Sequence, residues 1–481
     1  MLKQTCLAIA LAFLTGISHA STHDFQTAQA FNVPEIGSGI GLIDQQKERM
    51  IGEKVYRQVQ KQMPVLHHPW LEDQLSMTFS HVLSQTSSTQ QPVGLLLIND
   101  TQINAFAVPG GLFALNMGLI NSARKMDEVA GVMAHEIAHV TQRHYSRSRE
   151  AFKGQGLLSL AGILVGVLVA SQADGDAGAA VMLGSQAALM DQQLTYSRNQ
   201  EREADRIGMQ YMYAAGFNPN GMADFFEVMH RATNRVSFMP DFWMTHPLTT
   251  ERMSEARLRA NQMPAVQSKL NDENFAILRW YSKAITDQTS EQELKIMASR
   301  GYIAGQLALT QYYLQKSDFN EAQAILNQAK ALNKNQSLID LLQADIYIGQ
   351  NKFDLALQAV DTPSKLMPEN RALAYKKAEV LIQLGQTQQA QQLVSHFLQR
   401  NPSDISGLAL MLQAANAEQN SSLKAVNVLR YRAEYEFWTG YEDDAIKSML
   451  HAQRLAQSNQ AMSAKIKQRL TEMQKERRYK I

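Results

Sequence analysis

The spacing of hydrophobic residues divides the chain into a helical start, a short β region and a long helical remainder. Apolar residues recur every three or four positions in the helical parts. The β region instead holds three short apolar runs, separated by the turn residues Asn99-Asp100 and Pro109-Gly110-Gly111. The predicted elements are helices at about 43–83, 126–145 and 192–215, strands at 93–98, 105–108 and 112–115, and successive helices beyond 264. The predicted fold class is therefore mainly α with a small β-sheet.

The C-terminal helices contain a regular internal repeat. Ala322, Ala356 and Ala390 are equally spaced, and Pro368 and Pro402 are separated by the same interval. A period of about 34 residues, with small residues where paired helices approach closely, resembles the tetratricopeptide repeat. The same period relates Ala344 to Ala378, Tyr313 to Tyr347 and Phe319 to Phe353, and a fourth, offset unit is expected at 441–445 after an irregular stretch at 420–422. We expect an α-solenoid whose concave surface binds peptides or partner proteins. Irregular helical pairs are the alternative.

The segment 1–20 has the pattern of a secretory signal peptide. Lys3 supplies the positive start, positions 7–14 form a short apolar core, and Ser18-His19-Ala20 offers a small-residue cleavage site. The core is too short to span a bilayer as a retained helix. An uncleaved membrane anchor or a leading strand is the alternative. Cys6 is the only cysteine, so the mature protein would have none, and a bacterial periplasm fits best.

Charge and length narrow the function only slightly. The 46 basic and 45 acidic residues leave a formal charge of +1, so neither nucleic acid nor an acidic substrate is indicated as a partner. A length of 481 residues implies two or three domains. No long apolar run follows the N-terminal segment, which favours a mature protein with at most peripheral membrane contact.

The sequence Ala134-His135-Glu136-Ile137-Ala138-His139 carries the candidate chemistry. Residues four apart share one face of a helix, so His135 and His139 can present two imidazoles to one zinc ion. Glu136 lies beside the first histidine and can act as general base on a metal-bound water. The surrounding helix is apolar, where a glutamate and two histidines would be costly without a metal or partners. A structural histidine pair is the alternative.

A catalytic zinc site needs a third protein ligand and one open position. The segment 199–206 offers Glu201 and Asp205, which are four apart and share a helix face, whereas Glu203 points roughly to the other side. We therefore assign Glu201 as the third ligand. Asp205 is expected to hold a ligand imidazole in its tautomer. Without the upstream motif, an ordinary exposed helix end would be the preferred interpretation.

These residues resemble the gluzincin metallopeptidases, in particular the HtpX and CAAX-prenyl-protease type. The resemblance rests on His135-Glu136-x-x-His139, on Glu201-x-x-x-Asp205, and on the segment 104–111, which looks like that family's active-site strand and loop. It implies a zincin-like fold, one zinc ion per subunit and proteolysis. The combination of signal peptide, peptidase domain and repeats resembles periplasmic members of the family. It implies that unfolded or misassembled outer-membrane proteins are substrates, and that the repeats contact the β-barrel assembly machinery. Degradation and chaperone-like assistance would both belong to this quality-control role.

His246 is a further candidate because it stands in the sequence Thr245-His246-Pro247. Proline restricts the backbone of the residue before it, which suits holding an imidazole in a fixed place. The family resemblance implies that a histidine in this context can occupy the fourth position on zinc. We therefore predict that His246 is a ligand in the resting state and keeps the enzyme latent. A surface or helix-capping histidine is the alternative.

The segment 157–170 forms the longest apolar run after the N-terminus. It is too short to span a membrane, although the related HtpX-type enzymes retain membrane helices. A helical hairpin over the peptidase core is the preferred interpretation, with a lid or shallow membrane attachment as alternatives. The basic tail at 465–480 is most simply a solvated helix face, although it could touch anionic lipid or a partner.

The predicted organisation is a signal peptide at 1–20, a zinc metallopeptidase domain at 21–265 and a repeat domain at 266–481. In the predicted mechanism zinc-bound water attacks the peptide bond, with Glu136 as general base. Ala105, Phe106, Ala107 and Val108 would form an edge strand that binds the substrate backbone. A repeat-based chaperone or scaffold with minor peptidase activity is the competing interpretation. A zinc hydrolase of non-peptide bonds is disfavoured, because the adjacent strand suits extended polypeptide.

Overall fold

The computed structural model describes residues 45–88, 92–151, 198–233, 246–266, 272–332, 336–419 and 421–479. These residues all belong to one compact unit. The first part contains α1 (Gln45–Gln62), α2 (Pro69–Leu83), β1 (Gly94–Ile98), β2 (Ala105–Val108), β3 (Leu112–Asn116), α3 (Met117–Ser122), α4 (Met126–Thr141), α5 (His144–Ala151), α9 (Arg198–Ala214), α10 (Asn220–Thr233) and α12 (Thr250–Gln262). The predicted class, mainly α with a small sheet, is confirmed.

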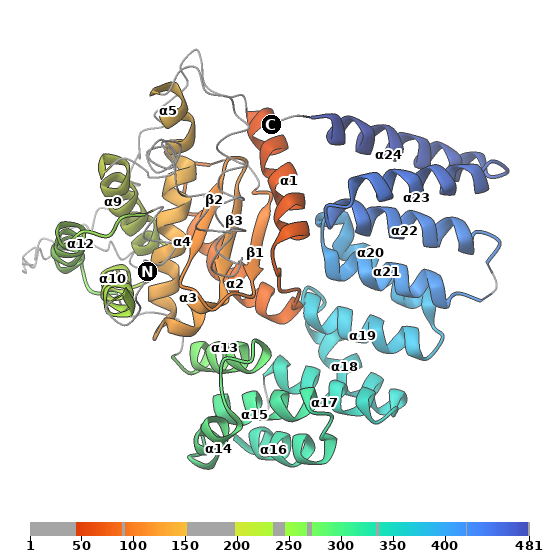
Figure 1. Cartoon of the computed structure of the whole chain (residues 1–481). Coiled ribbons are helices and arrows are strands. Elements are labelled where there is room, and N and C mark those ends of the chain that lie inside the picture. Colours follow the sequence, from red (N-terminus) through yellow and green to blue (C-terminus); the bar gives the residue numbers. More distant parts are fainter. Residues whose placement is uncertain are drawn as a thin grey trace, which may run out of the picture. The chain divides into compact units, whose positions relative to one another are not determined.

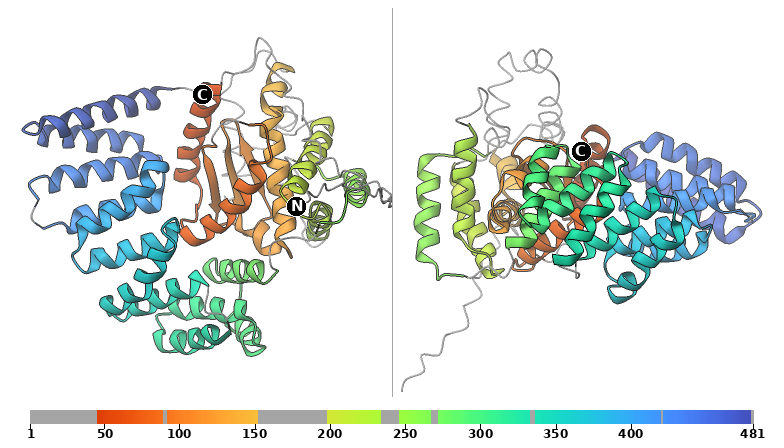
Figure 2. Two further views of the ribbon diagram at one scale, coloured as in Figure 1. Left: turned by 180° about the vertical axis from the view of Figure 1, so that it is seen from behind. Right: turned by 90° about the horizontal axis from the view of Figure 1, so that it is seen from below.

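The three strands form one sheet in the order β1-β3-β2, with β1 parallel and β2 antiparallel to β3 (Figure 1). The central strand β3 is buried along its whole length, as its uninterrupted apolar run requires. Gly110 and Gly111 turn the chain between β2 and β3 with φ values of 88° and 75°, which residues with a side chain rarely adopt. The ribbon views place α1 and α4 on opposite sides of the strands (Figures 1 and 2).

Two regions with a predicted helical pattern are interrupted in the structure. The region with the helical pattern at about 43–83 forms two helices, α1 and α2, because Pro64 cannot supply a helical N–H and Pro69 starts a new helix in its first turn. The helix predicted at 126–145 ends at Thr141. Arg143 then adopts a left-handed conformation with φ of 53°, and α5 begins at His144.

The remaining helices are α13 (Asp272–Ile285), α14 (Glu291–Ser299), α15 (Ile303–Gln315), α16 (Phe319–Leu332), α17 (Ser337–Gly349), α18 (Phe353–Leu366), α19 (Arg371–Gln383), α20 (Thr387–Arg400), α21 (Ile405–Ala417), α22 (Lys424–Trp438), α23 (Glu442–Leu455) and α24 (Gln460–Arg478). The starts of α15, α17, α19 and α21 recur with the period of the alanines, and so do those of α16, α18 and α20. The repeating alanines at 322, 356 and 390 are all fully buried. Figure 2 shows consecutive helices stacked as antiparallel neighbours.

The turn inside each helical pair has a left-handed residue at its start. Ser317, Asn351 and Gly385 occupy this position with the period of the repeat and φ of 57°, 58° and 74°. Gly440, with φ of 85°, occupies the same position between α22 and α23. The helical pair around 441–445 therefore uses the same turn in an offset register.

One hydrophobic cluster contains residues from both sides of the predicted boundary at 265. Ile51 and Val55 of α1 belong to the same buried cluster as Phe437 and Trp438 of α22. The ring of Tyr56 meets that of Trp438 edge-on at 5.9 Å between centroids. Charged pairs also cross the predicted boundary. Lys54 and Arg57 contact Glu442 at 2.7 and 2.8 Å. Arg371 contacts Glu72 and Asp73 at 2.5 and 2.8 Å.

Ending the chain at Pro264 is therefore expected to destabilise the fragment, although it keeps every candidate site residue. The truncation would expose apolar side chains of α1 that α22 covers in the whole chain, and each large side chain contributes about 1.5–3 kcal/mol when buried. Thermal melting and size-exclusion chromatography of the fragment and the full chain measure the effect. A monomeric fragment that melts like the full chain and processes native substrates at the full rate would contradict both a stabilising and a selecting role for the repeats.

Candidate metal centre

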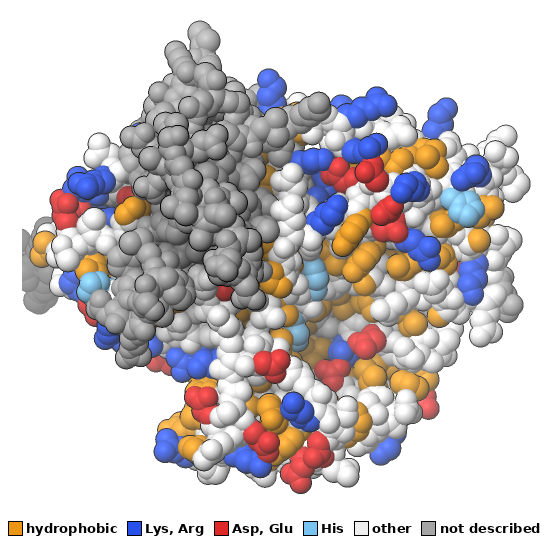
Figure 3. Space-filling model, viewed as in Figure 1, with side chains coloured by type: hydrophobic (Ala, Val, Ile, Leu, Met, Phe, Trp, Pro, Cys, Tyr) orange, Lys and Arg blue, Asp and Glu red, His pale blue; other side chains and the backbone are white. Residues whose placement is uncertain are grey.

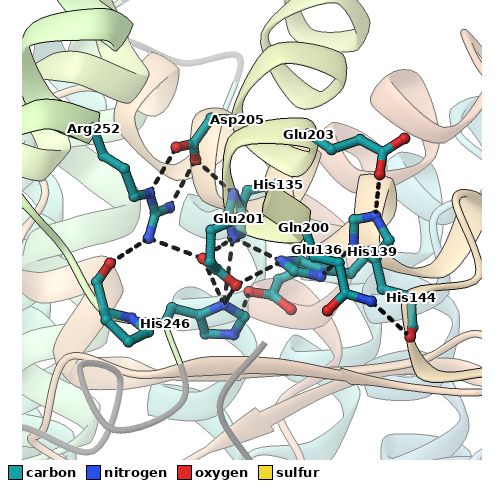
Figure 4. A network of polar contacts seen from close by, with 11 residues as sticks. His135, Glu136, His139, His144, Gln200, Glu201, Glu203, Asp205, His246 and Arg252 are labelled. Carbon is teal, nitrogen blue, oxygen red and sulfur yellow. Dashed lines mark hydrogen bonds and ion pairs between the residues drawn. The ribbon is translucent and has the colours of Figure 1, made fainter. Parts of the chain in front are cut away.

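Four buried side chains from three separate segments converge beside the sheet (Figure 4). Helix α4 supplies His135 and His139, α9 supplies Glu201, and His246 lies just before α12. One nitrogen or oxygen atom of each residue lies within 4.8 Å of the corresponding atoms of the others. Their exposed fractions are only 1–3%. Among the described residues this is the one group of at least three His, Cys, Asp or Glu side chains with metal-binding spacing.

A glycine allows the two main helices to approach closely enough for this convergence. Gly208 of α9 packs on the backbone of α4, where an added Cβ would lie 2.9 Å from the carbonyl carbon and oxygen of Ala134. That distance is too short for a side chain, so the glycine sets the separation of the helices. Glu201 therefore reaches the histidines of α4 from a neighbouring helix that the sequence motif does not include.

The distances within the cluster match the edges of a tetrahedral zinc site. Nε2 of His135 and Nε2 of His139 are 3.0 Å apart, and the carboxylate oxygens of Glu201 lie 3.5 and 3.4 Å from them. Zinc–nitrogen and zinc–oxygen bonds of about 2.0–2.1 Å place tetrahedral ligand atoms about 3.3 Å from one another. Two neutral imidazoles and a carboxylate are also a donor set that zinc accepts in catalytic sites. The residues present therefore fit a metal ion.

His246 occupies the fourth side of the cluster. Its Nδ1 atom lies 3.4 Å from Nε2 of His135 and 3.2 Å from Oε1 of Glu201, which are again distances expected between ligands of one ion. Its other ring nitrogen, Nε2, lies 3.5 Å from Oε1 of Glu136. The imidazole thus stands between the candidate ligands and the candidate general base.

Glu136 projects into the same buried region. Its side chain is 3% exposed, and its Oε1 atom makes a hydrogen bond with none of the described residues. A buried carboxylate oxygen without such a partner raises the free energy of the folded state unless another group donates a hydrogen bond to it. A water molecule or a substrate at the centre would supply that group, which suits a carboxylate whose task is to accept a proton.

Asp205 contacts the outer nitrogen of His135 and is itself held by an arginine. Its Oδ1 lies 2.9 Å from Nδ1 of His135, and Arg252 binds both carboxylate oxygens at 2.7 and 2.8 Å. Arg252 also contacts Oε2 of Glu201 at 2.9 Å and donates to the carbonyl of Pro247 at 2.8 Å. It therefore ties the carboxylates of Glu201 and Asp205 to the residue that follows His246. The sequence analysis did not identify this arginine, and its only signal is its place in the first turn of the helix after His246.

His144 and Glu203 form a second contact chain that the sequence analysis missed. Nδ1 of His144 lies 2.8 Å from Nδ1 of His139, and its Nε2 lies 3.1 Å from Oε2 of Glu203. Arg147 also contacts that oxygen, at 2.8 Å. The helix break at Arg143 brings His144 back onto His139, a contact that an uninterrupted helix would not make. Glu203 does point away from the four-residue cluster, as its helix position predicts.

The ionisable side chains of the cluster shift one another's pKa values. Burial alone would lower the pKa of His135, but hydrogen bonds to Asp205 and Glu201 outweigh it and raise that pKa to about 10. Burial, together with the neighbouring histidines, holds the pKa of His139 well below its usual value. Burial would raise the pKa of Glu201, but His246 and Arg252 keep it well below the usual range. The carboxylate therefore stays ionised and available as a ligand.

Strand β2 lies at an edge of the sheet, as the substrate-binding prediction requires. Its four residues, Ala105–Val108, pair with β3 on one side and are 0–6% exposed. The part of the chain described here contains no helix long and apolar enough to cross a membrane. The predicted signal peptide at 1–20, the apolar run at 157–170 and Thr245 lie outside the described residues.

Comparison with known proteins relates most of the chain to proteases. The sequence profile of Peptidase family M48 matches residues 69–260. A beta-barrel assembly-enhancing protease of Yersinia pestis is 31% identical over 392 residues, 79% of this chain and 80% of that protein. The protein of the same name from Escherichia coli (strain K12) is 30% identical over 439 residues, 89% of each chain. The mitochondrial metalloendopeptidase OMA1 of Schizosaccharomyces pombe is 28% identical over 211 residues, covering 43% of this chain and 59% of that protein.

Proposed function

The chain belongs to peptidase family M48 and is a metalloprotease, and from this premise we propose that it is a zinc-dependent endopeptidase of the periplasm. It acts in the quality control and assembly of outer-membrane proteins, where it degrades misassembled chains and assists others. The observation that carries the zinc assignment is the set of 3.0–3.5 Å distances among His135, His139 and Glu201. Four-coordinate zinc requires these separations.

His135, His139 and Glu201 would hold the ion. Zinc supplies Lewis acidity when bound, polarising the scissile carbonyl and lowering the pKa of a water molecule. The carboxylate of Asp205 lies 2.9 Å from the outer ring nitrogen of His135 and would orient this imidazole with the lone pair of its inner nitrogen toward the ion. Arg252 contacts the carboxylates of Glu201 and Asp205, and its positive charge offsets these two buried negative charges.

Glu136 moves the proton. Its buried carboxylate accepts the proton of the attacking water and then passes it to the leaving amine. The position next to His135 on α4 fixes the carboxylate beside the centre, within 3.5 Å of the imidazole of His246. Burial excludes bulk water, which strengthens electrostatic interactions during the reaction.

Strand β2 would bind the substrate. Among the described strands β2 pairs only with β3, and its other edge would pair with an extended polypeptide, whose main chain would then run beside the candidate ligands of α4. This mode of binding recognises backbone and so suits unfolded segments of many sequences. Native folded proteins offer few such segments, which favours misassembled chains as substrates.

The helical pairs would select partners. We assign them as tetratricopeptide repeats, because helix starts, buried alanines and left-handed turns share one period. In Figure 3 the face over these helices carries hydrophobic side chains among lysines, arginines and acidic residues. Such a mixed surface suits protein partners better than nucleic acid. The names of the two bacterial relatives support the β-barrel assembly machinery as the partner.

Cleavage assays on one outer-membrane β-barrel protein test the proposed role. The purified enzyme should degrade the urea-unfolded chain after dilution and leave the same protein intact when it is folded in detergent micelles. Equal cleavage of both forms, or of neither, would contradict a role in removing misassembled chains.

The position of His246 suggests that the resting enzyme is latent. Its Nδ1 atom stands where a fourth zinc ligand would stand, and Arg252 fixes the adjacent Pro247 carbonyl. A water molecule cannot take that position while the imidazole is there. Substrate or partner binding would move this segment, in the manner of a gate.

Replacing His246 with alanine is therefore expected to raise basal proteolysis or self-cleavage by roughly tenfold, because the fourth position becomes open to water. The rate of casein degradation by the variant and the wild type measures the effect. A lower rate in the variant would contradict latency and would indicate that His246 stabilises the transition state. His451, an exposed histidine on α23, provides a control substitution with no expected effect.

A further inference from the structure

The two histidines of the metal motif are supported in different ways on their outer sides. His135 meets a carboxylate, since Oδ1 of Asp205 lies 2.9 Å from its Nδ1. His139 instead meets another histidine, with Nδ1 of His144 at 2.8 Å from its Nδ1 (Figure 4). His144 is fully buried, and its ring lies at 80° to that of His139 with 4.8 Å between centroids. The contact is therefore a directed hydrogen bond between rings rather than a stacking arrangement.

The position of the metal cluster determines where the protons lie in this pair. His139 turns Nε2 toward His135 and Glu201, so this nitrogen must offer its lone pair to an ion. Its proton is then on Nδ1, because a neutral imidazole carries one proton. That N–H can donate to Nδ1 of His144 only if the latter is unprotonated. The proton of His144 is consequently on Nε2.

Glu203 completes the chain at the outer end. Its Oε2 lies 3.1 Å from Nε2 of His144 and accepts that proton in a hydrogen bond. Arg147 contacts the same oxygen at 2.8 Å and balances the carboxylate charge. The order of contacts is thus Glu203, His144, His139 and the metal position, with each hydrogen bond fixing the tautomer of the next ring.

We propose that His144 and Glu203 are positioning residues that orient His139 for metal binding. The inference rests on the proposed zinc function and adds an outer support to one ligand of that site. Hydrogen-bonded partners of this kind restrict the ring of a ligand histidine and increase its basicity. Without His144, the buried N–H of His139 would lose its acceptor and the ring could turn away from the ion.

Two substitutions of His144 with side chains of similar size distinguish the loss of the hydrogen-bond acceptor from the loss of packing. Asparagine at position 144 can place an amide oxygen near the position of Nδ1 and still accept from His139, whereas leucine fills the space without an acceptor. Zinc dissociation constants are measured by competition with a chromophoric chelator, and visible spectra are recorded after replacement of zinc by Co²⁺. Both readouts are independent of catalysis.

The proposal predicts that His144→Leu weakens zinc binding by about 10–100-fold and changes the Co²⁺ spectrum, while His144→Asn stays within about tenfold of the wild type. Glu203→Ala should weaken binding by about tenfold, because it removes the acceptor that fixes His144. Glu203 is partly exposed, so this variant tests the chain even if position 144 does not tolerate leucine.

A double-mutant cycle tests whether Glu203 acts through His144. Glu203→Ala should have little further effect on zinc affinity in the His144→Leu protein, since the link to His139 is already absent. Asp224→Ala is the matched control, because it removes a partly buried carboxylate that pairs with Arg257 rather than with a site histidine. The control should leave zinc affinity unchanged.

The outcomes distinguish this inference from the proposed function. A wild-type protein that binds no zinc would overturn the zinc function itself. Wild-type zinc binding together with unchanged affinity and Co²⁺ spectra in His144→Leu and Glu203→Ala would overturn only the positioning role. Additive losses in the double variant would overturn the serial order of the contacts.

Discussion

Replacing Glu136 with glutamine is expected to reduce peptide-bond cleavage by a factor on the order of 10² or more, with fold and zinc content nearly unchanged. Glutamine keeps the size and shape of the side chain but cannot accept the proton of the attacking water. The amide also does not take part in the proposed metal coordination. Initial rates of casein cleavage and elemental analysis of the purified variant measure the two properties together.

Glu128→Gln provides the matched control for this experiment. Glu128 is a buried glutamate on the same helix, but its side chain binds Arg124 instead of facing the cluster. The control should keep its cleavage rate even if its stability falls. Undiminished cleavage by Glu136→Gln would contradict the proposed mechanism, because the other two carboxylates described at the centre, Glu201 and Asp205, are assigned to holding the metal and to orienting His135.

Replacing His135 with alanine is expected to remove bound zinc as well as activity. The imidazole contributes one candidate ligand atom, and its loss leaves Asp205 without the ring that it orients. Because zinc binds only the folded state, the variant should also lose the rise in melting temperature that added zinc gives the wild type. Elemental analysis and thermal melts with and without zinc record both effects.

The comparison between the two variants carries more information than either result alone. Glu136→Gln should separate chemistry from metal binding, whereas His135→Ala should abolish both. A zinc content of one ion per chain in His135→Ala would refute its assignment as a ligand. His230→Ala, at an exposed histidine near the end of α10, is a control that should bind zinc normally.

Local sequence patterns are sufficient to predict much of this structure. The alternation of short apolar runs predicts β2 at Ala105–Val108 with its observed bounds, because the turn residues on both sides leave few alternatives. The regular spacing of the alanines likewise predicts helices whose starts recur at the same interval. Helix periodicity predicts that Glu201 and Asp205 share a face, and both contact the histidines of α4.

The residues that sequence reasoning missed act through contacts between distant elements. Arg252 reaches Asp205 across 47 positions of sequence, and no spacing rule connects them. His144 follows His139 by five positions, a spacing that places two side chains apart on a continuous helix. The left-handed conformation of Arg143 ends the helix and reverses this expectation. Side-chain partners of this type depend on tertiary packing, which hydrophobic periodicity does not record.

The two predicted domains are not structurally independent of each other. Aromatic residues of α22 complete the hydrophobic cluster of α1 and the sheet, so the peptidase part is stabilised by the C-terminal helices. Removing the C-terminal helices would therefore change both substrate selection and folding stability, and the two effects could not be separated. Substitutions in the repeats that leave this cluster intact are the appropriate way to test recognition alone.

Restoring zinc to metal-stripped protein tests the central claim most directly. Casein cleavage should be absent without metal, rise in proportion to added zinc and reach its plateau at one equivalent per chain. The Glu136→Gln protein should bind the same equivalent and remain inactive throughout the titration. Cleavage that persists after complete removal of metal, or that is absent at every zinc concentration, would contradict the assignment of this protein as a zinc endopeptidase.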